Sequence, residues 1–172
     1  MTCPELMLDQ DILHRMLAGR TVLVCVGNEW RGDEAVAPLV AGLIGPSNRV
    51  SVVNCGETPE NYLGVIASSK PDSLVIISAV DFGGAVGELR VVGRREIGAF
   101  ELATLAPRLL ILTDYVEAET AAATWFIGIQ PASLEFGTPL GATVAEVGRE
   151  LAGAINEAIW GPRSRGPAPP RG

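Results

Sequence analysis

Short apolar runs, each ending in a small or polar residue, recur along the chain and alternate with segments of helical periodicity. The runs lie at residues 22–26, 50–53, 74–77 and 125–129 and are rich in Val, Ile and Leu. Runs of this length and composition predict strands that are buried on both faces of a sheet. Residues 87–92 instead alternate apolar and polar positions, which predicts a half-buried strand. Because the loop before it is short, we expect this strand to run antiparallel to residues 74–77.

The segments between these runs carry apolar residues at steps of three and four, as a helix with one buried face requires. Thr58 and Thr138 are each followed by proline and are the expected N-caps of two helices. The helices are predicted at residues 8–18, from Val36 to Ile44, from Pro59 onward, around residues 105–121, and from Pro139 to residue 160.

Strands separated by helices at this spacing predict an α/β fold. We expect three layers, with a mostly parallel, twisted sheet of about five strands, one antiparallel edge strand and helices on both faces. Residues 1–19 are interpreted as an N-terminal helical extension and residues 20–160 as the α/β domain. Residues 161–172 form a Pro- and Arg-rich tail without apolar anchors, which predicts disorder.

Composition limits the classes of function. The chain has 172 residues, enough for one domain, and a net charge of -7, which argues against nucleic acid as a partner. Three cysteines without CxxC spacing predict neither a zinc site nor a disulfide framework. No apolar run reaches the ~18 residues of a membrane span, and the N-terminus lacks the basic region of a signal peptide. We therefore expect a cytoplasmic protein without a membrane span.

Candidate chemistry gathers at the ends of the first and third predicted strands, where ligands bind in open α/β sheets. Asp33 and Glu34 follow the first strand, and Ser78 and Asp81 follow the third. These acids could form a pocket for a hard cation such as magnesium. Two simpler explanations remain open: a solvated acidic rim without metal, and acids placed to complement the dipole at a helix start.

Several separated motifs resemble those of the hydrogenase maturation endopeptidases, which trim the C-terminus of the large subunit of nickel–iron hydrogenases. They are Val26-Gly27-Asn28, then Gly32-Asp33-Glu34 before an apolar helix, and Gly128-Ile129-Gln130-Pro131 at the end of a late strand. A looser match occurs at Asn54-Cys55-Gly56, where the family often has Asp-Gly-Gly. The resemblance covers about residues 20–160 in the family's order and implies the family's α/β fold.

The resemblance also implies a mode of nickel recognition through an acid, an Asp and a His, a donor set that suits a borderline divalent metal. The family-matched acid is Glu34, but Ser78 stands in place of the Asp, and no histidine occurs near residues 105–107. Asp81 is a possible substitute and Asp33 a neighbouring acid. The chain is thus interpreted as a divergent member that lacks two of the three metal-recognition ligands, unless His14, its one histidine, reaches the site.

By the same resemblance, nickel belongs to the substrate, no organic cofactor is expected, and the partner is a hydrogenase large-subunit precursor bound by a monomer. Catalytic residues are not assigned. A Ser-His-Asp triad would need His14 to activate Ser78, and an aspartic dyad would need Asp81 beside Glu34. Three hypotheses follow: an active endopeptidase, an inactive relative serving as a binding or assembly factor, and an unrelated small-molecule binder on the same frame.

Overall fold

The structure is a computed structural model that describes residues 8–97 and 106–161, so the predicted tail lies outside the described residues except for Gly161. Within these ranges, no helix is long and apolar enough to cross a lipid bilayer. In chain order the elements are α1 (Gln10–Met16), β1 (Thr21–Val26), the 3₁₀ turn η1 (Gly32–Ala35), α2 (Val36–Leu43), β2 (Val50–Gly56), the 3₁₀ turn η2 (Pro59–Tyr62), α3 (Leu63–Ser68), β3 (Ser73–Ala79), β4 (Leu89–Gly93), α4 (Arg94–Ile97), α5 (Ala106–Glu119), β5 (Ala123–Ile129) and α6 (Ala142–Trp160).

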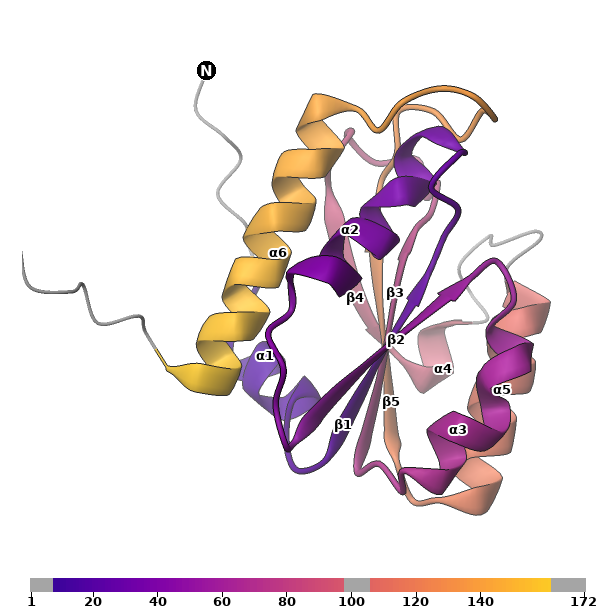
Figure 1. Cartoon of the computed structure of the whole chain (residues 1–172), viewed down its shortest axis with the longest axis vertical. Helices are drawn as coiled ribbons and strands as arrows, with labels where there is room; N and C mark the ends of the chain where they lie inside the picture. Colours follow the sequence, from indigo (N-terminus) through magenta and orange to yellow (C-terminus); the bar gives the residue numbers. More distant parts are fainter. Residues whose placement is uncertain (1–7, 98–105, 162–172) are drawn as a thin grey trace, which may run out of the picture.

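The strands form one five-stranded sheet in the order β2-β1-β3-β5-β4 (Figure 1). All neighbouring pairs are parallel except β4 and β5. The predicted α/β sheet with one antiparallel edge strand is therefore confirmed. β4 follows β3 in the chain, yet it does not lie beside β3, because β5 pairs with β3 and takes that place. The register sets Val26 of β1 opposite Ser78 of β3.

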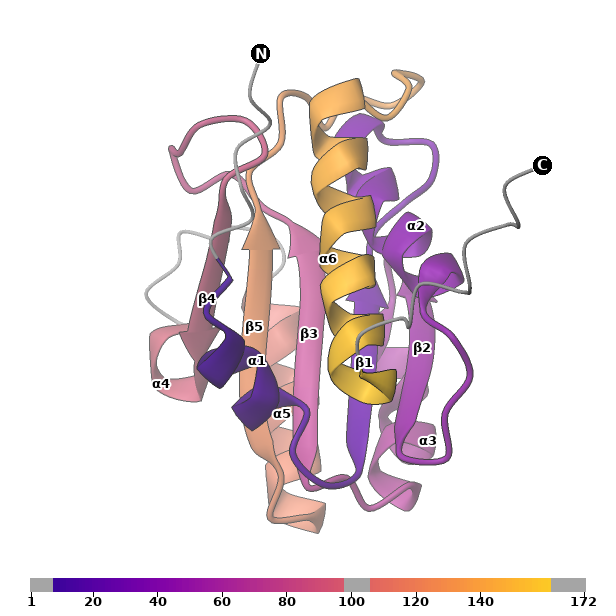
Figure 2. The ribbon, with the colours of Figure 1, turned by 90° about the vertical axis from the view of Figure 1, so that its left-hand side faces the viewer.

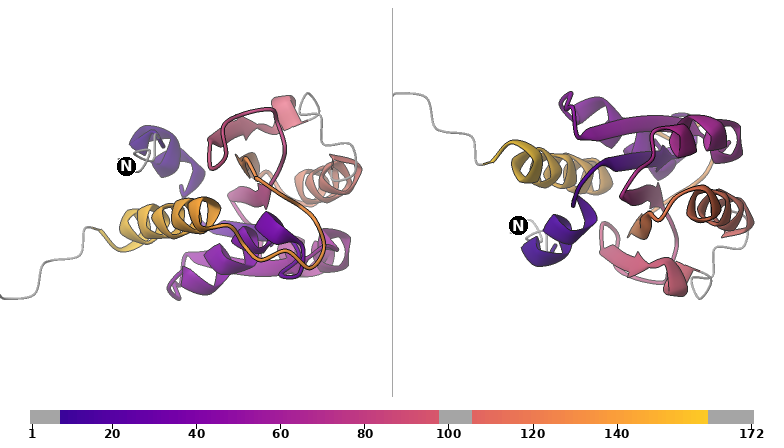
Figure 3. Two further views of the ribbon diagram at one scale, coloured as in Figure 1. Left: turned by 90° about the horizontal axis from the view of Figure 1, so that it is seen from above. Right: turned by 90° about the horizontal axis from the view of Figure 1, so that it is seen from below.

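Helices cover both faces of the sheet, as expected (Figures 1 and 3). One core lies under α1, α2 and α6, and a second lies under α3, α4 and α5. All six residues of β1 are buried, because Leu23 and Cys25 enter the first core and Val22, Val24 and Val26 enter the second. This two-sided burial explains why β1 reads as an uninterrupted apolar run.

The first helix lies beside α6 on the same face of the sheet, in front of β5 (Figure 2), and its last residue is tied to the amino end of β3. Leu13 and Met16 of α1 are buried in the core that α6 shares. The hydroxyl of Ser73, the first residue of β3, donates a 2.5 Å hydrogen bond to the Met16 carbonyl. The opposite, carboxyl edge of the sheet is therefore left to the loops that follow β1, β2, β3 and β5.

The start of the last helix differs from its prediction. α6 begins at Ala142 with Gly141 as N-cap, so Thr138 does not cap it. The Thr138 hydroxyl instead donates to the Glu135 carbonyl at 2.6 Å, and the Thr138 carbonyl accepts from the Gly32 amide. The loop before α6 is thus held against η1, and the helix begins only after this contact is made. Thr58 precedes η2 as expected, but its side chain makes no capping hydrogen bond.

Candidate functional site

The carboxyl edge of the sheet is built around the turn from β1 into η1. Gly27 follows β1 and lies so close to η1 that a Cβ on it would be 2.2 Å from the Glu34 carbonyl oxygen. This contact needs glycine and places Glu34 directly above the end of β1. The Glu34 carboxylate is half-buried, and its Oε2 accepts a 3.2 Å hydrogen bond from the Asn28 amide. The loop therefore fixes this carboxylate and leaves it partly open to solvent.

Asp33 differs from its neighbour, because its carboxylate is buried and holds two distant segments together. Oδ2 accepts from the Ala132 amide at 2.7 Å and the Ser133 amide at 3.3 Å, and Oδ1 accepts from the Gly141 amide at 2.8 Å. The residue is 2% exposed. Three amide donors from the loop between β5 and α6 occupy both oxygens, so we assign Asp33 a structural role.

Ser78 lies near the end of β3, opposite the end of β1. It is 2% exposed, and its hydroxyl donates a 2.8 Å hydrogen bond to the Val26 carbonyl. The hydroxyl proton is therefore directed at the backbone of the neighbouring strand. No histidine or carboxylate of the described residues accepts a hydrogen bond from it.

Asp81 is exposed on the loop after β3 and is held by Gln130, which follows β5. Asp81 Oδ1 accepts from Gln130 Nε2 at 2.9 Å and from the Gly83 amide at 3.0 Å. Both bonds favour the ionised form, with that from Gln130 the larger cause, and they lower the pKa of Asp81 below its usual value. Gln130 Oε1, the side-chain amide oxygen, accepts from the Phe82 and Gly84 amides at 2.8 and 3.1 Å.

Gln130 is the residue whose role sequence reasoning missed. It is 5% exposed and bonds both the side chain and the backbone of the 81–84 loop, so it shapes this part of the edge. The available signal was its place in Gly-Ile-Gln-Pro, a polar residue at the end of a buried strand. Such a residue needs hydrogen-bond partners once it is buried.

Glu34, Ser78 and Asp81 therefore share the carboxyl edge of neighbouring strands, but no hydrogen bond joins any two of them within the described residues. Over the same ranges, no group of three or more His, Cys, Asp or Glu side chains is placed to hold a metal ion. Their assignment as metal-recognition residues remains a prediction, and Asp33 is the neighbouring acid, with both oxygens bonded to backbone amides.

His14 lies far from this edge. Its ring is exposed on α1, with Nδ1 2.6 Å from the Gln10 carbonyl oxygen. Met16, two residues later, contacts the first residue of β3, whereas Ser78 is five residues further along that strand, about 16 Å at 3.3 Å per residue. The Ser78 hydroxyl donates to the Val26 carbonyl and the exposed His14 ring contacts the Gln10 carbonyl, so a Ser-His-Asp triad is not formed in this fold.

The two described cysteines are free and buried. Burial is the main cause that raises the pKa of Cys25 to about 12 and that of Cys55 to about 12. A thiol with so high a pKa is a poor nucleophile at neutral pH, because the thiolate is the reactive form. Neither residue is therefore a candidate for cysteine-peptidase chemistry.

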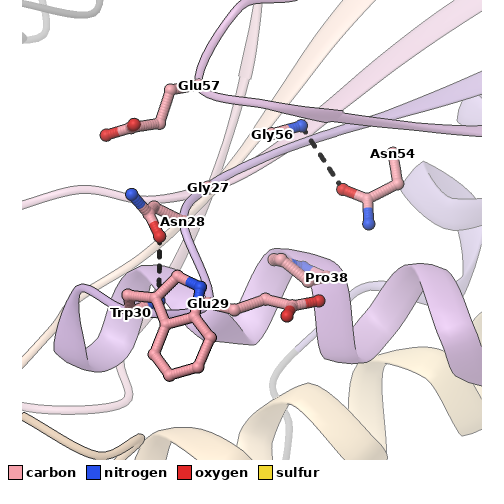
Figure 4. Close-up of a pocket in the computed structure, with 8 residues that line it drawn as sticks. All are labelled: Gly27, Asn28, Glu29, Trp30, Pro38, Asn54, Gly56 and Glu57. Atoms are coloured by element: carbon pink, nitrogen blue, oxygen red, sulfur yellow. Dashed lines mark hydrogen bonds between the residues drawn. The ribbon is translucent and has the colours of Figure 1, made fainter. Parts of the chain in front are cut away.

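A cavity of about 270 Å³ opens at the same edge, over the ends of β1 and β2 (Figure 4). It is lined by Gly27, Asn28, Glu29, Trp30, Pro38, Asn54, Gly56 and Glu57. None of Glu34, Ser78 and Asp81 is among these residues, although Glu34 accepts a hydrogen bond from the amide of Asn28, which is. This cavity therefore lies next to the predicted metal-recognition residues, on the β2 side of the same edge.

The ionisation of Glu34 gives a testable dependence of stability on pH. Burial is the main cause that raises the pKa of Glu34 above its ordinary 4.5, and the Arg31 guanidinium and the Asn28 amide offset this in part. The folded state therefore holds this proton more tightly than the unfolded state, and stability falls as pH rises from 4.5 through the raised pKa. We expect Glu34→Gln to stabilise the protein more at about pH 7.5 than at about pH 4. Calorimetric melting at both pH values measures this, and a larger gain at pH 4 would contradict it.

Comparisons with known proteins agree with the geometry. The family model described as hydrogenase maturation protease matches residues 36–158. The chain is 34% identical over 122 residues to the hydrogenase 3 maturation protease of Escherichia coli K12, covering 69% of this chain and 78% of that protein. It is 26% identical over 151 residues to a putative hydrogenase maturation protease of Methanocaldococcus jannaschii, covering 81% and 88%.

Solved structures show that the similarity extends over most of the fold. The crystal structure of the [NiFe] hydrogenase maturation protease HycI from Thermococcus kodakarensis superposes with a TM-score of 0.78 at 33% identity. That match covers 86% of this chain and 98% of the HycI chain. The superposition and the sequence matches point the same way, and the chain belongs to the hydrogenase maturation protease family.

Proposed function

We propose that this protein acts in nickel–iron hydrogenase maturation as an endopeptidase on the C-terminal extension of a large-subunit precursor. The observation that carries the proposal is the family match over residues 36–158. Glu34 supports it, because its half-buried carboxylate stands at the carboxyl edge of the sheet, where the family's acidic ligand is expected. Nickel would enter as cargo of the precursor, and no organic cofactor is needed.

The recognition of that nickel would rest on Glu34 as a charged oxygen ligand. Asp81 would approach it only by exchanging its bonds to Gln130 and Gly83. The hydroxyl of Ser78 is neutral and already donates to Val26, so it is a weak ligand beside the carboxylate that the family places there. We therefore expect weak nickel affinity in this chain.

A second candidate function is favoured by the same observation at Ser78. If the nickel in the precursor is bound too weakly to be positioned for hydrolysis, the chain would bind the precursor without cleaving it. It would then serve as a binding or assembly factor in hydrogenase maturation. The free thiols of Cys25 and Cys55 fit a reducing compartment such as the cytoplasm for either role.

Incubation with a purified, nickel-loaded large-subunit precursor separates the two candidates. A downward shift of the precursor on a denaturing gel, abolished by Glu34→Ala, would support the endopeptidase. Co-elution with the precursor on gel filtration without a size shift would support the binding factor. Neither cleavage nor co-elution would contradict both.

Restoring the missing ligands tests the basis of weak nickel recognition. Ser78→Asp together with Ala106→His adds a carboxylate and an imidazole, and we expect nickel affinity to rise at least about tenfold, as changes in a metal's ligand environment commonly do. Calorimetric titration with nickel measures this, with Glu34→Ala in the restored background as control. If the unmodified protein binds nickel tightly, and neither the restored ligands nor Glu34→Ala changes that affinity, other residues form the site.

A further inference from the structure

The cavity over β1 and β2 has a lining that is acidic and aromatic at once. Figure 4 shows the Trp30 ring and Glu29 along one side of it, with the Glu29 carboxylate next to Pro38. Asn54 and Glu57 lie on the other side, and the Glu57 carboxylate points away from Glu29. The lining contains two carboxylates and no basic side chain. Its volume of about 270 Å³ is just below the usual range of small-molecule pockets and suits one long side chain.

The charge of this lining is only partly balanced. Glu57 forms an ion pair with Arg31 at 3.8 Å, in which both side chains are more than 40% exposed. Glu29 makes no hydrogen bond or ion pair with any other described residue. A cation entering the cavity would therefore meet one free carboxylate and one weakly paired carboxylate, in a chain whose net charge is -7.

Trp30 offers the aromatic surface that a cation also prefers. Its side chain is unusually open for a tryptophan, at 69% exposure. Its backbone is nevertheless fixed, because its amide donates to Asn28 Oδ1 at 2.8 Å and its carbonyl accepts from the Gly137 amide at 2.7 Å. An exposed indole on a fixed stretch of backbone beside a carboxylate is suited to bind an ammonium or guanidinium group on its face.

We propose that this cavity binds a single arginine or lysine side chain from an extended segment of the hydrogenase large-subunit precursor. The aliphatic part of that side chain packs on the Trp30 ring, and its charged end lies beside the Glu29 carboxylate. The inference rests on the proposed function for the identity of the partner. The preference for a cationic side chain rests on the cavity alone.

A pair of short peptides tests the cavity without the precursor. The probes are acetyl-Gly-Gly-Arg-Gly-Gly-amide and the same peptide with citrulline, which keeps the shape of arginine and removes its charge. In ¹⁵N-resolved NMR titrations we expect the arginine peptide to shift the Trp30 indole resonance. We expect the citrulline peptide to bind at least about fivefold more weakly, the factor for about 1 kcal/mol of cation–π and ionic contact.

Matched variants test whether the arginine peptide binds at Glu29 and Trp30. Glu29→Gln and Trp30→Leu should each weaken the arginine peptide about three- to tenfold. Glu119→Gln and Trp160→Leu make the same changes on exposed residues at the ends of α5 and α6, at the opposite edge of the sheet, and should leave binding unchanged. Equal binding of the two peptides, or shifts centred on Trp160, would overturn the inference and leave the proposed function standing.

The precursor itself decides the identity of the occupant. Full-length protein should bind the purified precursor, and Glu29→Gln should weaken that binding by a factor similar to its effect on the arginine peptide. Unchanged precursor affinity in Glu29→Gln, with weakened peptide binding, would overturn the precursor as occupant. Failure of the wild-type chain to bind precursor at all would overturn both the proposed function and that occupant.

Discussion

Replacing Asp33 by alanine is expected to lower the free energy of unfolding by about 3–4 kcal/mol, because the buried carboxylate accepts three backbone hydrogen bonds. Its loss frees the amides of Ala132, Ser133 and Gly141 and detaches the loop before α6 from η1. For a chain of this size, the loss corresponds to a fall in melting temperature of about 10 °C. Urea unfolding followed by circular dichroism measures it.

Two further variants make this result specific. Asp33→Asn keeps an oxygen acceptor and should lose about half as much stability. Asp114→Ala removes an exposed aspartate that pairs with Arg94 on the surface, and such pairs contribute about 1 kcal/mol at most. An Asp33→Ala protein as stable as the Asp114→Ala variant would show that the loop does not depend on this carboxylate.

Replacing Gly27 by alanine is expected to cost about 3 kcal/mol and to displace Glu34. A Cβ on Gly27 would lie 2.2 Å from the Glu34 carbonyl oxygen, a backbone atom that cannot move without shifting η1 or the end of β1. Overpacking of this kind costs about 1–3 kcal/mol or more. Thermal unfolding measures the loss of stability, and the precursor assay measures the effect of moving Glu34.

Gly153 provides the matched control for this substitution. It lies within α6, and a Cβ there would meet nothing within 4 Å. Gly153→Ala should therefore raise stability by about 0.5–1 kcal/mol, because alanine favours the helix over glycine. If Gly27→Ala were as harmless as Gly153→Ala, the close approach of η1 to β1 would not constrain the position of Glu34.

The layers of the fold could be predicted because their signals are local. Each buried strand is a short apolar run ended by a turn residue, and such a run predicts the burial of β1 on both faces. The order of the last strands was less predictable. Nothing within residues 74–92 indicates that β5, some 30 residues later, will pair with β3 and separate it from β4.

The candidate site shows the same division between local and distant causes. Its location after β1 follows from the Gly-turn and the acids at the helix start, and the motifs indicated the family from the sequence alone. Asp33 and Glu34 are adjacent acids with the same local preference, yet one is buried on three amides and the other half-exposed on Asn28. That difference depends on amides about 100 residues away in the chain.

The remaining features of the edge arose only on folding. Gln130 reaches the 81–84 loop because β5 lies next to β3, and the cavity forms because the loops after β1 and β2 face each other across Pro38. Residues that line one cavity or share one hydrogen-bond network are brought together by packing of distant segments, whereas hydrophobic periodicity reports only which face of its own element a residue occupies. The sequence therefore determined the frame, the family and the acidic turn, and tertiary packing decided which acid is structural and where the open cavity lies.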